Sequence, residues 1–97
     1  MYICIVISNK SFERISKALG DPNRVAILQE IKRNKNCLFC SEIHELVNLA
    51  QPSISHHLKQ LADAELIIPE KEGRNLKYAL NKPVIDDYID FLRQLNS

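Results

Sequence analysis

The sequence predicts a mainly α-helical fold of the α+β class, with about five helices and one two-stranded β-hairpin. Its 97 residues suit one small domain, which we expect to span residues 1–97. Apolar residues recur at helical spacing through most of the chain, and the rarity of glycine and proline makes the breaks between elements easy to place. A chain of this length buries only about 60% of its unfolded surface, so a homodimer that covers more apolar area is expected.

The composition is that of an ordinary globular protein and excludes a polybasic tail. The 13 Lys and Arg side chains nearly balance the 12 Asp and Glu side chains. Residues 1–10 form a predicted N-terminal extension. Residues 1–8 within it are apolar, but they lack the basic start and cleavage site of a signal peptide and are too few to cross a bilayer, which takes about 20. Three cysteines, an odd number, fit no closed disulfide framework, so we expect a cytoplasmic protein with no membrane contact.

Two helices are predicted in the first third of the chain. Phe12, Ile15 and Leu19 recur at helical spacing, and Gly20 follows them as a helix stop. The dipeptide 21–22 (DP) then begins a second helix, because Asp accepts hydrogen bonds from free N–H groups and Pro suits the first helical position.

A pair of short helices, at about residues 41–64, is predicted next. The first begins at Ser41, a turn follows at residues 49–50, and the second begins near Gln51. One inward face of the second helix carries Ile54, Leu58 and Leu61. Two helices joined by a tight turn are typical of a helix-turn-helix.

A β-hairpin, at about residues 66–80, is predicted directly after this pair. Apolar residues 67–68 and 76–80 form its strands, and residues 72–75 (EGRN) form its turn. Pro69 lacks an N–H donor, so its strand must lie at an edge or carry a bulge. A hairpin in this place makes the fold a winged helix-turn-helix.

The last helix, at about residues 83–96, carries too many apolar residues for one stripe. A helix that is apolar on two sides needs two partners, of which one is its own core and the other is most simply a second copy of the chain. The residues expected at this dimer interface are Ile85, Tyr88, Ile89 and Leu92.

The helix that begins near Gln51 has the features of a DNA-reading helix. With Ile54 placed inward, small polar and basic residues occupy the outer face, which suits entry into a major groove. Residues 46–62 contain no acidic side chain, and residues 1–82 carry 12 basic against 9 acidic side chains, whereas the last helix is acidic. We expect His57 to pack at the core edge. The expected DNA contacts are Gln51, Ser53, Ser55, His56 and Lys59 from the helix, and Lys71, Arg74 and Lys77 from the hairpin.

Two other classes of function were weighed against DNA binding. An enzyme is not expected, because the chain has no glycine-rich phosphate loop, no Gly-x-Ser-x-Gly and no His-Glu-x-x-His. A winged helix used only for protein contacts stays open, because the net charge is only +1. Salt separates these alternatives, since binding to DNA phosphates weakens as salt rises.

Several motifs of the chain resemble the ArsR/SmtB family, in that family's order. They are residues 17–28 (KALGDPNRVAIL), 41–43 (SEI), 49–61 (LAQPSISHHLKQL), 72–74 (EGR) and 78–80 (YAL). The resemblance covers about residues 12–92. It implies a homodimeric winged-helix repressor that binds a near-palindromic DNA operator and leaves it when an effector binds, the effector in many members being a metal ion or a thiol-reactive species.

The metal sites of that family carry over only in part. The positions of the last-helix zinc site correspond to Lys82, Val84 and Leu95, which are not zinc ligands. A second kind of site uses a Cys-Val-Cys motif before the turn, and the register places Phe39 and Ser41 at its cysteines. This chain has its cysteines one or two residues away.

The cysteines themselves leave the sensing question open. If the short helix began early, Cys37, Cys40 and His44 would share one face and suit a thiophilic metal ion, with Cys4 as a further ligand. The pair Cys37 and Cys40 could also oxidise to a disulfide as a redox switch. The alternative is that Cys40, close to the face of Ile43, is a small buried hydrophobe.

Overall fold

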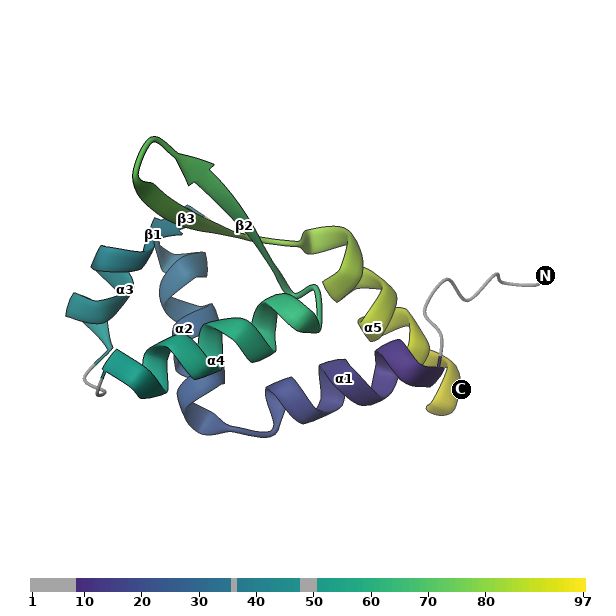
Figure 1. Cartoon of the computed structure of the whole chain (residues 1–97). Helices are drawn as coiled ribbons and strands as arrows, with labels where there is room; N and C mark the ends of the chain where they lie inside the picture. Colours follow the sequence, from purple (N-terminus) through teal and green to yellow (C-terminus); the bar gives the residue numbers. More distant parts are fainter. Residues whose placement is uncertain (1–8, 36, 48–50) are drawn as a thin grey trace.

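The computed structural model describes residues 9–35, 37–47 and 51–97. Five helices and three strands follow one another in these parts of the chain (Figure 1). In chain order they are α1 (Asn9–Leu19), α2 (Pro22–Arg33), β1 (Cys37–Phe39), α3 (Cys40–Leu46), α4 (Gln51–Asp63), β2 (Ile67–Glu72), β3 (Asn75–Leu80) and α5 (Lys82–Leu95).

The ends of the N-terminal helices follow local chemistry. Helix α1 begins at Asn9, so the last two residues of the predicted 1–10 extension are helical; residues 1–8 lie outside the described parts. Asp21 accepts a hydrogen bond from the Asn23 N–H at 2.8 Å and so caps α2, with Pro22 in the first turn as predicted.

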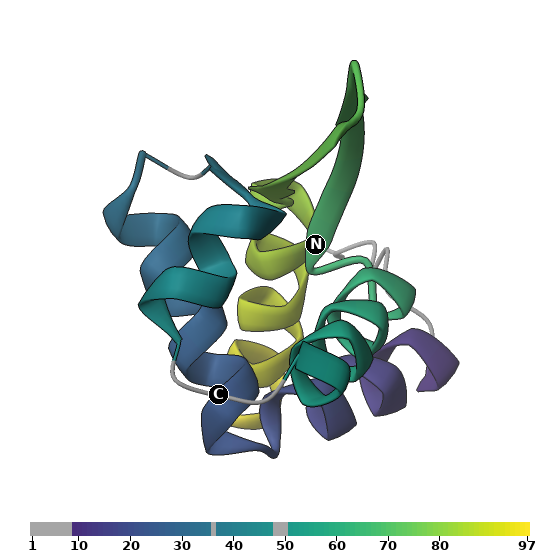
Figure 2. The same ribbon diagram turned by 60° about the vertical axis from the view of Figure 1, so that its left-hand side comes forward.

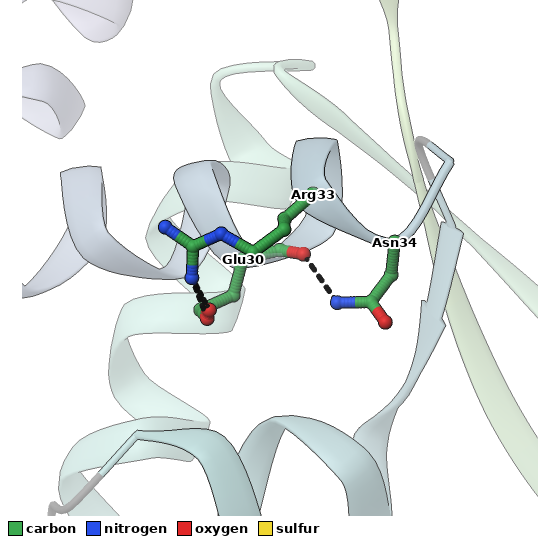
Figure 3. A network of polar contacts seen from close by, with 3 residues as sticks. All are labelled: Glu30, Arg33 and Asn34. Carbon is green, nitrogen blue, oxygen red and sulfur yellow. Dashed lines mark hydrogen bonds and ion pairs between the residues drawn. The ribbon is translucent and has the colours of Figure 1, made fainter.

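The C-terminal end of α2 is closed by polar side chains (Figure 3). Arg33 pairs with the carboxylate of Glu30, and the Asn34 side-chain amide donates to the Glu30 carbonyl oxygen at 2.8 Å. The Glu30 carbonyl oxygen also accepts from the backbone N–H of Asn34 at 3.2 Å, so the side-chain amide adds a second hydrogen bond at this helix end. The chain can then leave the helix and enter β1.

The sheet has three antiparallel strands in the order β1-β3-β2, so the prediction of a two-stranded sheet was incomplete. Strand β1 pairs with β3 through Leu38 opposite Tyr78. From sequence, residues 37–40 are a short apolar link or a strand, and their partner lies about forty residues away, so local pattern could not reveal how this third strand pairs. Pro69 lies in β2, at the edge of the sheet as its missing donor requires.

The core lies between the helices and the inner face of the sheet. The side chains with at most 1% of their surface exposed are Ile15, Ile27, Ile31, Leu38, Ile43, Ile54, Leu61 and Ile67. They come from α1 to α4 and from strands β1 and β2, so every one of these elements contributes to one cluster. The hairpin of β2 and β3 extends beyond this core and projects from the helices (Figure 2).

Helices α1 and α5 lie side by side at one end of the molecule (Figure 1). The ring of Phe12 stacks on Phe91 with centroids 4.3 Å apart and on Tyr88 at 5.5 Å. The hydroxyls of Ser16 and Tyr88 are 2.9 Å apart and share a hydrogen bond. The aromatic residues that recur along α5 therefore have a partner within the same chain.

Candidate nucleic-acid interface

Helix α4 has a buried face and an exposed polar face, as its sequence pattern predicted. Ile54, Leu58 and Leu61 are at most 3% exposed. The opposite face carries Ser53, Ser55, His56 and Lys59, all of them exposed. Gln51 is the first residue of α4, but its side chain lies outside the described part. The predicted DNA contacts of this helix that can be placed therefore share one accessible surface, which we call the α4 polar face.

The cation of the α4 polar face has an acidic partner that the prediction missed. Lys59 Nζ lies 3.1 Å from Asp63 Oδ2, one turn further along α4. Both side chains are more than half exposed, so this ion pair is weak and Lys59 can exchange Asp63 for another anion. The i,i+4 spacing of the two residues was the sequence signal for this contact.

The basic residues of the hairpin do not share one face. Cross-strand partners lie on the same side of a sheet, and Lys71 is opposite Leu76 while Lys77 is opposite Glu70. Lys71 and Lys77 therefore point to opposite sides. The pairing register of the two strands decides to which side each lysine points, and composition alone could not show these directions.

The side chain of Lys77 is partly buried by its neighbours, whereas Arg74 is exposed at the tip of the hairpin. Lys77 Nζ lies 3.3 Å from Glu72 Oε2 and 5.9 Å from the ring centre of Phe39. The hydrogen bond to Glu72 raises the pKa of the Lys77 ammonium group. Gly73, with φ +64°, forms the turn that places Arg74 at the end of the wing.

The early helix start on which a shared metal face of the cysteines depended is not found in the described residues. The predicted site required Cys37, Cys40 and His44 on one helical face, but α3 begins only at Cys40, and Cys37 lies in β1 opposite Ala79. Among the described residues, no three or more His, Cys, Asp or Glu side chains gather as metal ligands. Cys4 lies outside those residues.

Cys40 has the environment of a structural thiol. It is half-buried and packs against the core cluster. This burial raises the pKa of the Cys40 thiol, which favours the protonated form. Thiolates are the metal ligands and nucleophiles, so this burial disfavours the reactive form of Cys40.

The predicted dimer residues of α5 fall into two groups. Ile85 and Tyr88 pack against the core of their own chain. Ile89 and Leu92 are 39% and 42% exposed, and Leu95, which the prediction left out, is 70% exposed. Exposed apolar residues gathered on one helix mark a surface that a partner can cover. We call Ile89, Leu92 and Leu95 the α5 apolar face.

A remaining sequence expectation concerned membranes. Over the stretches that the structure describes, none of the helices combines the length and apolar character that spanning a bilayer requires.

Comparison with known proteins identifies the family. Residues 19–70 match the family model described as a helix-turn-helix domain. The chain is 34% identical to the arsenical resistance operon repressor of Staphylococcus aureus, over 94% of this chain and 86% of the relative. The chain belongs to the ArsR/SmtB family. Like its relatives in the ArsR/SmtB family, it is a DNA-binding transcriptional regulator.

Other ArsR/SmtB proteins agree in sequence and fold. The transcriptional repressor SdpR of Bacillus subtilis is 37% identical, over 80% of this chain and 84% of the relative. A solved ArsR family transcriptional regulator superposes with a TM-score of 0.80 at 27% identity, covering 92% of this chain and 90% of that one. A Mycobacterium bovis domain described as a homodimeric winged helix-turn-helix has a TM-score of 0.71 at 18% identity, covering 90% and 80%, and it shows the shared fold.

Proposed function

We propose that this ArsR/SmtB protein is a homodimeric repressor that reads an operator with the α4 polar face and leaves it when an effector binds. The observation that carries the proposal is the division of α4 into a fully buried side and an exposed side of small polar and basic residues. Such a helix is anchored firmly and still offers hydrogen-bonding groups to a base edge. A surface used only for protein contacts would not need this composition.

Each residue of the α4 polar face has a defined role in the proposal. A major groove about 12 Å wide admits one helix, and the hydroxyls of Ser53 and Ser55 donate to or accept from base edges there. Gln51, at the start of the helix, is of a type that pairs with adenine through two hydrogen bonds. Lys59 releases Asp63 and binds a phosphate, which sets the register of the helix on DNA.

The hairpin contributes a second contact in the proposal. Arg74 is exposed at the tip of the projecting wing, where it can reach a phosphate or an adjacent minor groove. Lys71 supports it from one side of the hairpin. Lys77 stays paired with Glu72 and stiffens the wing rather than contacting DNA, in contrast to the expectation from sequence.

A second copy of the chain covers the α5 apolar face in this proposal. Two copies related by a two-fold axis place their α4 helices about 34 Å apart, which is one turn of DNA. The homodimeric description of the Mycobacterium bovis domain, which shares the fold, supports this arrangement. Regulators of transcription act where the DNA lies, so we place the protein in the cytoplasm.

The effector acts on the spacing of the two α4 helices. Three relatives carry names that link them to arsenical resistance, which supports a chemical signal that releases the repressor. Coupling of about 1–3 kcal/mol between effector and DNA is the usual scale for such linkage. The burial of Cys40 argues against that thiol as the receptor, so we leave the class of effector to experiment.

The test begins with selection of a duplex by the full-length protein from a random-sequence DNA library. Fluorescence anisotropy then measures the affinity for the selected duplex and for a scrambled duplex, across a series of salt concentrations. A palindromic selected site, with affinity that falls as salt rises, supports the proposal. If no sequence is enriched, and binding to arbitrary duplexes is weak and independent of their sequence, the proposal is overturned in favour of a protein-binding winged helix.

A further inference from the structure

Arg24 joins three helices at the back of the DNA-reading helix. It lies in α2, and its Nε donates to the carbonyl oxygen of Ala18 at 2.8 Å while its Nη2 donates to that of Lys17 at 3.1 Å. Both carbonyls belong to the last turn of α1, where they lack partners within the helix. The third group, Nη1, lies 3.3 Å from Nδ1 of His57 in α4.

The contact with Arg24 determines which form of His57 is compatible with the fold. A guanidinium has only donors and stays charged at every accessible pH, so Nδ1 of His57 must accept and its proton must lie on Nε2. His57 is 8% exposed, so water cannot readily replace this partner. Protonation of Nδ1 would set an N–H against an N–H and a cation against a cation.

Three further ionisable groups lie around the pair. The backbone hydrogen bond from Asn23, and after it the charges of His57 and Arg24, lower the pKa of the carboxyl group of Asp21, which lies before α2. On α4 the ring of the exposed His56 is 6.0 Å from that of His57. From α1, the ammonium of Lys17 is exposed and pairs with Glu13. Asp21 is the group that carries a negative charge among these three.

We propose that Arg24 and His57 are positioning residues that hold α4 against α1 and α2 in its DNA-reading orientation, and that they do so only while His57 is neutral. This inference rests on the proposed reading of DNA by α4. Protonation of His57 breaks the contact with Arg24 and loosens the helix from the end of α1. Because α1 also stacks against α5, the same pair connects the proposed dimer helix with the DNA-reading helix.

The two neighbouring histidines then have opposite effects on DNA binding as pH falls. Histidine is the side chain that ordinarily changes charge between pH 5 and 8, so a binding assay over about pH 5.5 to 8 tests both effects. Protonation of His56, on the α4 polar face, adds a cation near phosphates and strengthens binding with a steeper salt dependence. Protonation of His57 weakens binding without changing the number of phosphate contacts.

The first test concerns the pair itself and needs no DNA. Nitrogen-15 NMR of the full chain reports the tautomer of His57 and its titration, and we expect a neutral ring with the proton on Nε2. Arg24→Gln should shift the His57 ring nitrogen signals and its titration, while Lys17→Gln, which keeps its backbone carbonyl, should not. A proton on Nδ1 at neutral pH, or unchanged signals in Arg24→Gln, would overturn the pairing whatever happens with DNA.

The second test measures affinity for the selected duplex between pH 8 and 5.5. It uses His56→Asn as the background, which removes the opposing titration. In this background we expect affinity to fall about 2- to 10-fold as pH drops, the range for loss of one hydrogen bond. His57→Asn, whose side-chain oxygen can accept from Arg24, should retain affinity and lose the pH dependence, whereas His57→Leu should bind weakly at every pH.

The outcomes separate this inference from the proposed function. If the chain selects no duplex, the reading of DNA by α4 fails and takes the positioning role with it. If it binds DNA and His57→Asn keeps the full pH dependence of the His56→Asn background, only the positioning role fails. Thermal unfolding of each variant, followed alongside, identifies any variant that has lost affinity simply because it no longer folds.

Discussion

Lys59 is the side chain through which the proposed DNA contact can be measured most directly. Its removal takes away one phosphate contact, so Lys59→Ala should weaken binding to selected and scrambled duplexes alike. The slope of log affinity against log salt should become shallower by about 1. Anisotropy titrations across a salt series measure both quantities.

The matched control for Lys59 is Arg93. It is also an exposed cation paired with a carboxylate on its own helix, with Nη1 3.7 Å from Asp90 Oδ1, but it lies on α5. Arg93→Gln should leave the salt slope unchanged. An equal loss of slope in both variants would mean that general charge, and not the α4 polar face, attracts DNA.

The buried thiol of Cys40 should make the stability of the folded protein depend on pH. Burial raises the pKa of its thiol above the ordinary 9.0, so the folded state keeps a proton that the unfolded state loses as pH rises. Its contribution to stability is therefore unaffected well below pH 9 and declines as pH rises through that value. Cys40→Ser should make the free energy of unfolding fall less steeply between pH 8 and 10, as measured by urea denaturation.

The same burial predicts slow chemistry at Cys40. In a Cys4→Ser, Cys37→Ser background Cys40 is the sole thiol, and its alkylation by iodoacetamide at pH 7.5 should be several-fold slower in the folded protein than in urea. Faster alkylation in the folded state would show an activated thiolate. That result would revive the role of Cys40 as a sensing thiol.

At the scale of the element, α4 has a buried side that contributes to stability and an exposed side to which the proposal assigns recognition of DNA. Ile54 is fully buried, so Ile54→Ala should cost about 2–5 kcal/mol of unfolding free energy through the cavity that it leaves. Chemical denaturation of the variant at low temperature measures this loss.

Ser55 is the neighbouring control on the exposed side of α4. Ser55→Ala should change the unfolding free energy by less than about 0.5 kcal/mol, because its side chain contributes no burial. It should nevertheless reduce discrimination between the selected and the scrambled duplex. A large stability loss in Ser55→Ala, or none in Ile54→Ala, would show that the two faces of the helix have been assigned the wrong way round.

The hairpin shows which features of a strand can be predicted from local sequence pattern. Its position, its turn and the edge location of Pro69 could all be predicted, because turn residues and a missing donor act locally. The opposite directions of Lys71 and Lys77 could not, since they depend on register against β3. The contact of Lys77 with Phe39 further depends on the pairing of β1 with β3, which local sequence did not reveal, whereas its ion pair with Glu72 joins β3 to β2.

At the scale of the whole molecule, the α5 apolar face predicts the assembly. Replacing Ile89 and Leu92 together by Glu would place charges in the proposed interface, so the variant should be monomeric where the unaltered protein is a dimer. Affinity for the selected duplex should fall by about 10²-fold or more, because the two half-sites are no longer bound by linked helices. Sedimentation and anisotropy measure the two effects.

Gln94→Glu is the control for this variant, since Gln94 is exposed on the same helix without belonging to the α5 apolar face. It should stay dimeric and bind DNA as before. If the variant that combines Ile89→Glu with Leu92→Glu remained dimeric, the interface would lie elsewhere on the molecule.

The sequence by itself determined the order of the elements, the buried face of α4 and the packing of His57. These follow from helical periodicity, from Asp and Pro at a helix start and from glycine in turns, all of which act over a few residues. The family could be inferred in the same way, because its motifs are local and occur in order. The 8% exposure of His57 confirms its placement at the core edge.

Only the tertiary structure decided how distant residues meet. Three features depend on contacts between segments that are far apart in the chain, or on where an element begins. They are the third strand, the separation of Cys37 from the helix that begins at Cys40, and the contact of Arg24 with His57. Strand register and the contacts between distant segments belong to the folded chain as a whole, and local pattern carries no record of them. For this reason the buried face of α4 could be predicted from its periodicity, whereas the contact of Arg24 with His57 could not.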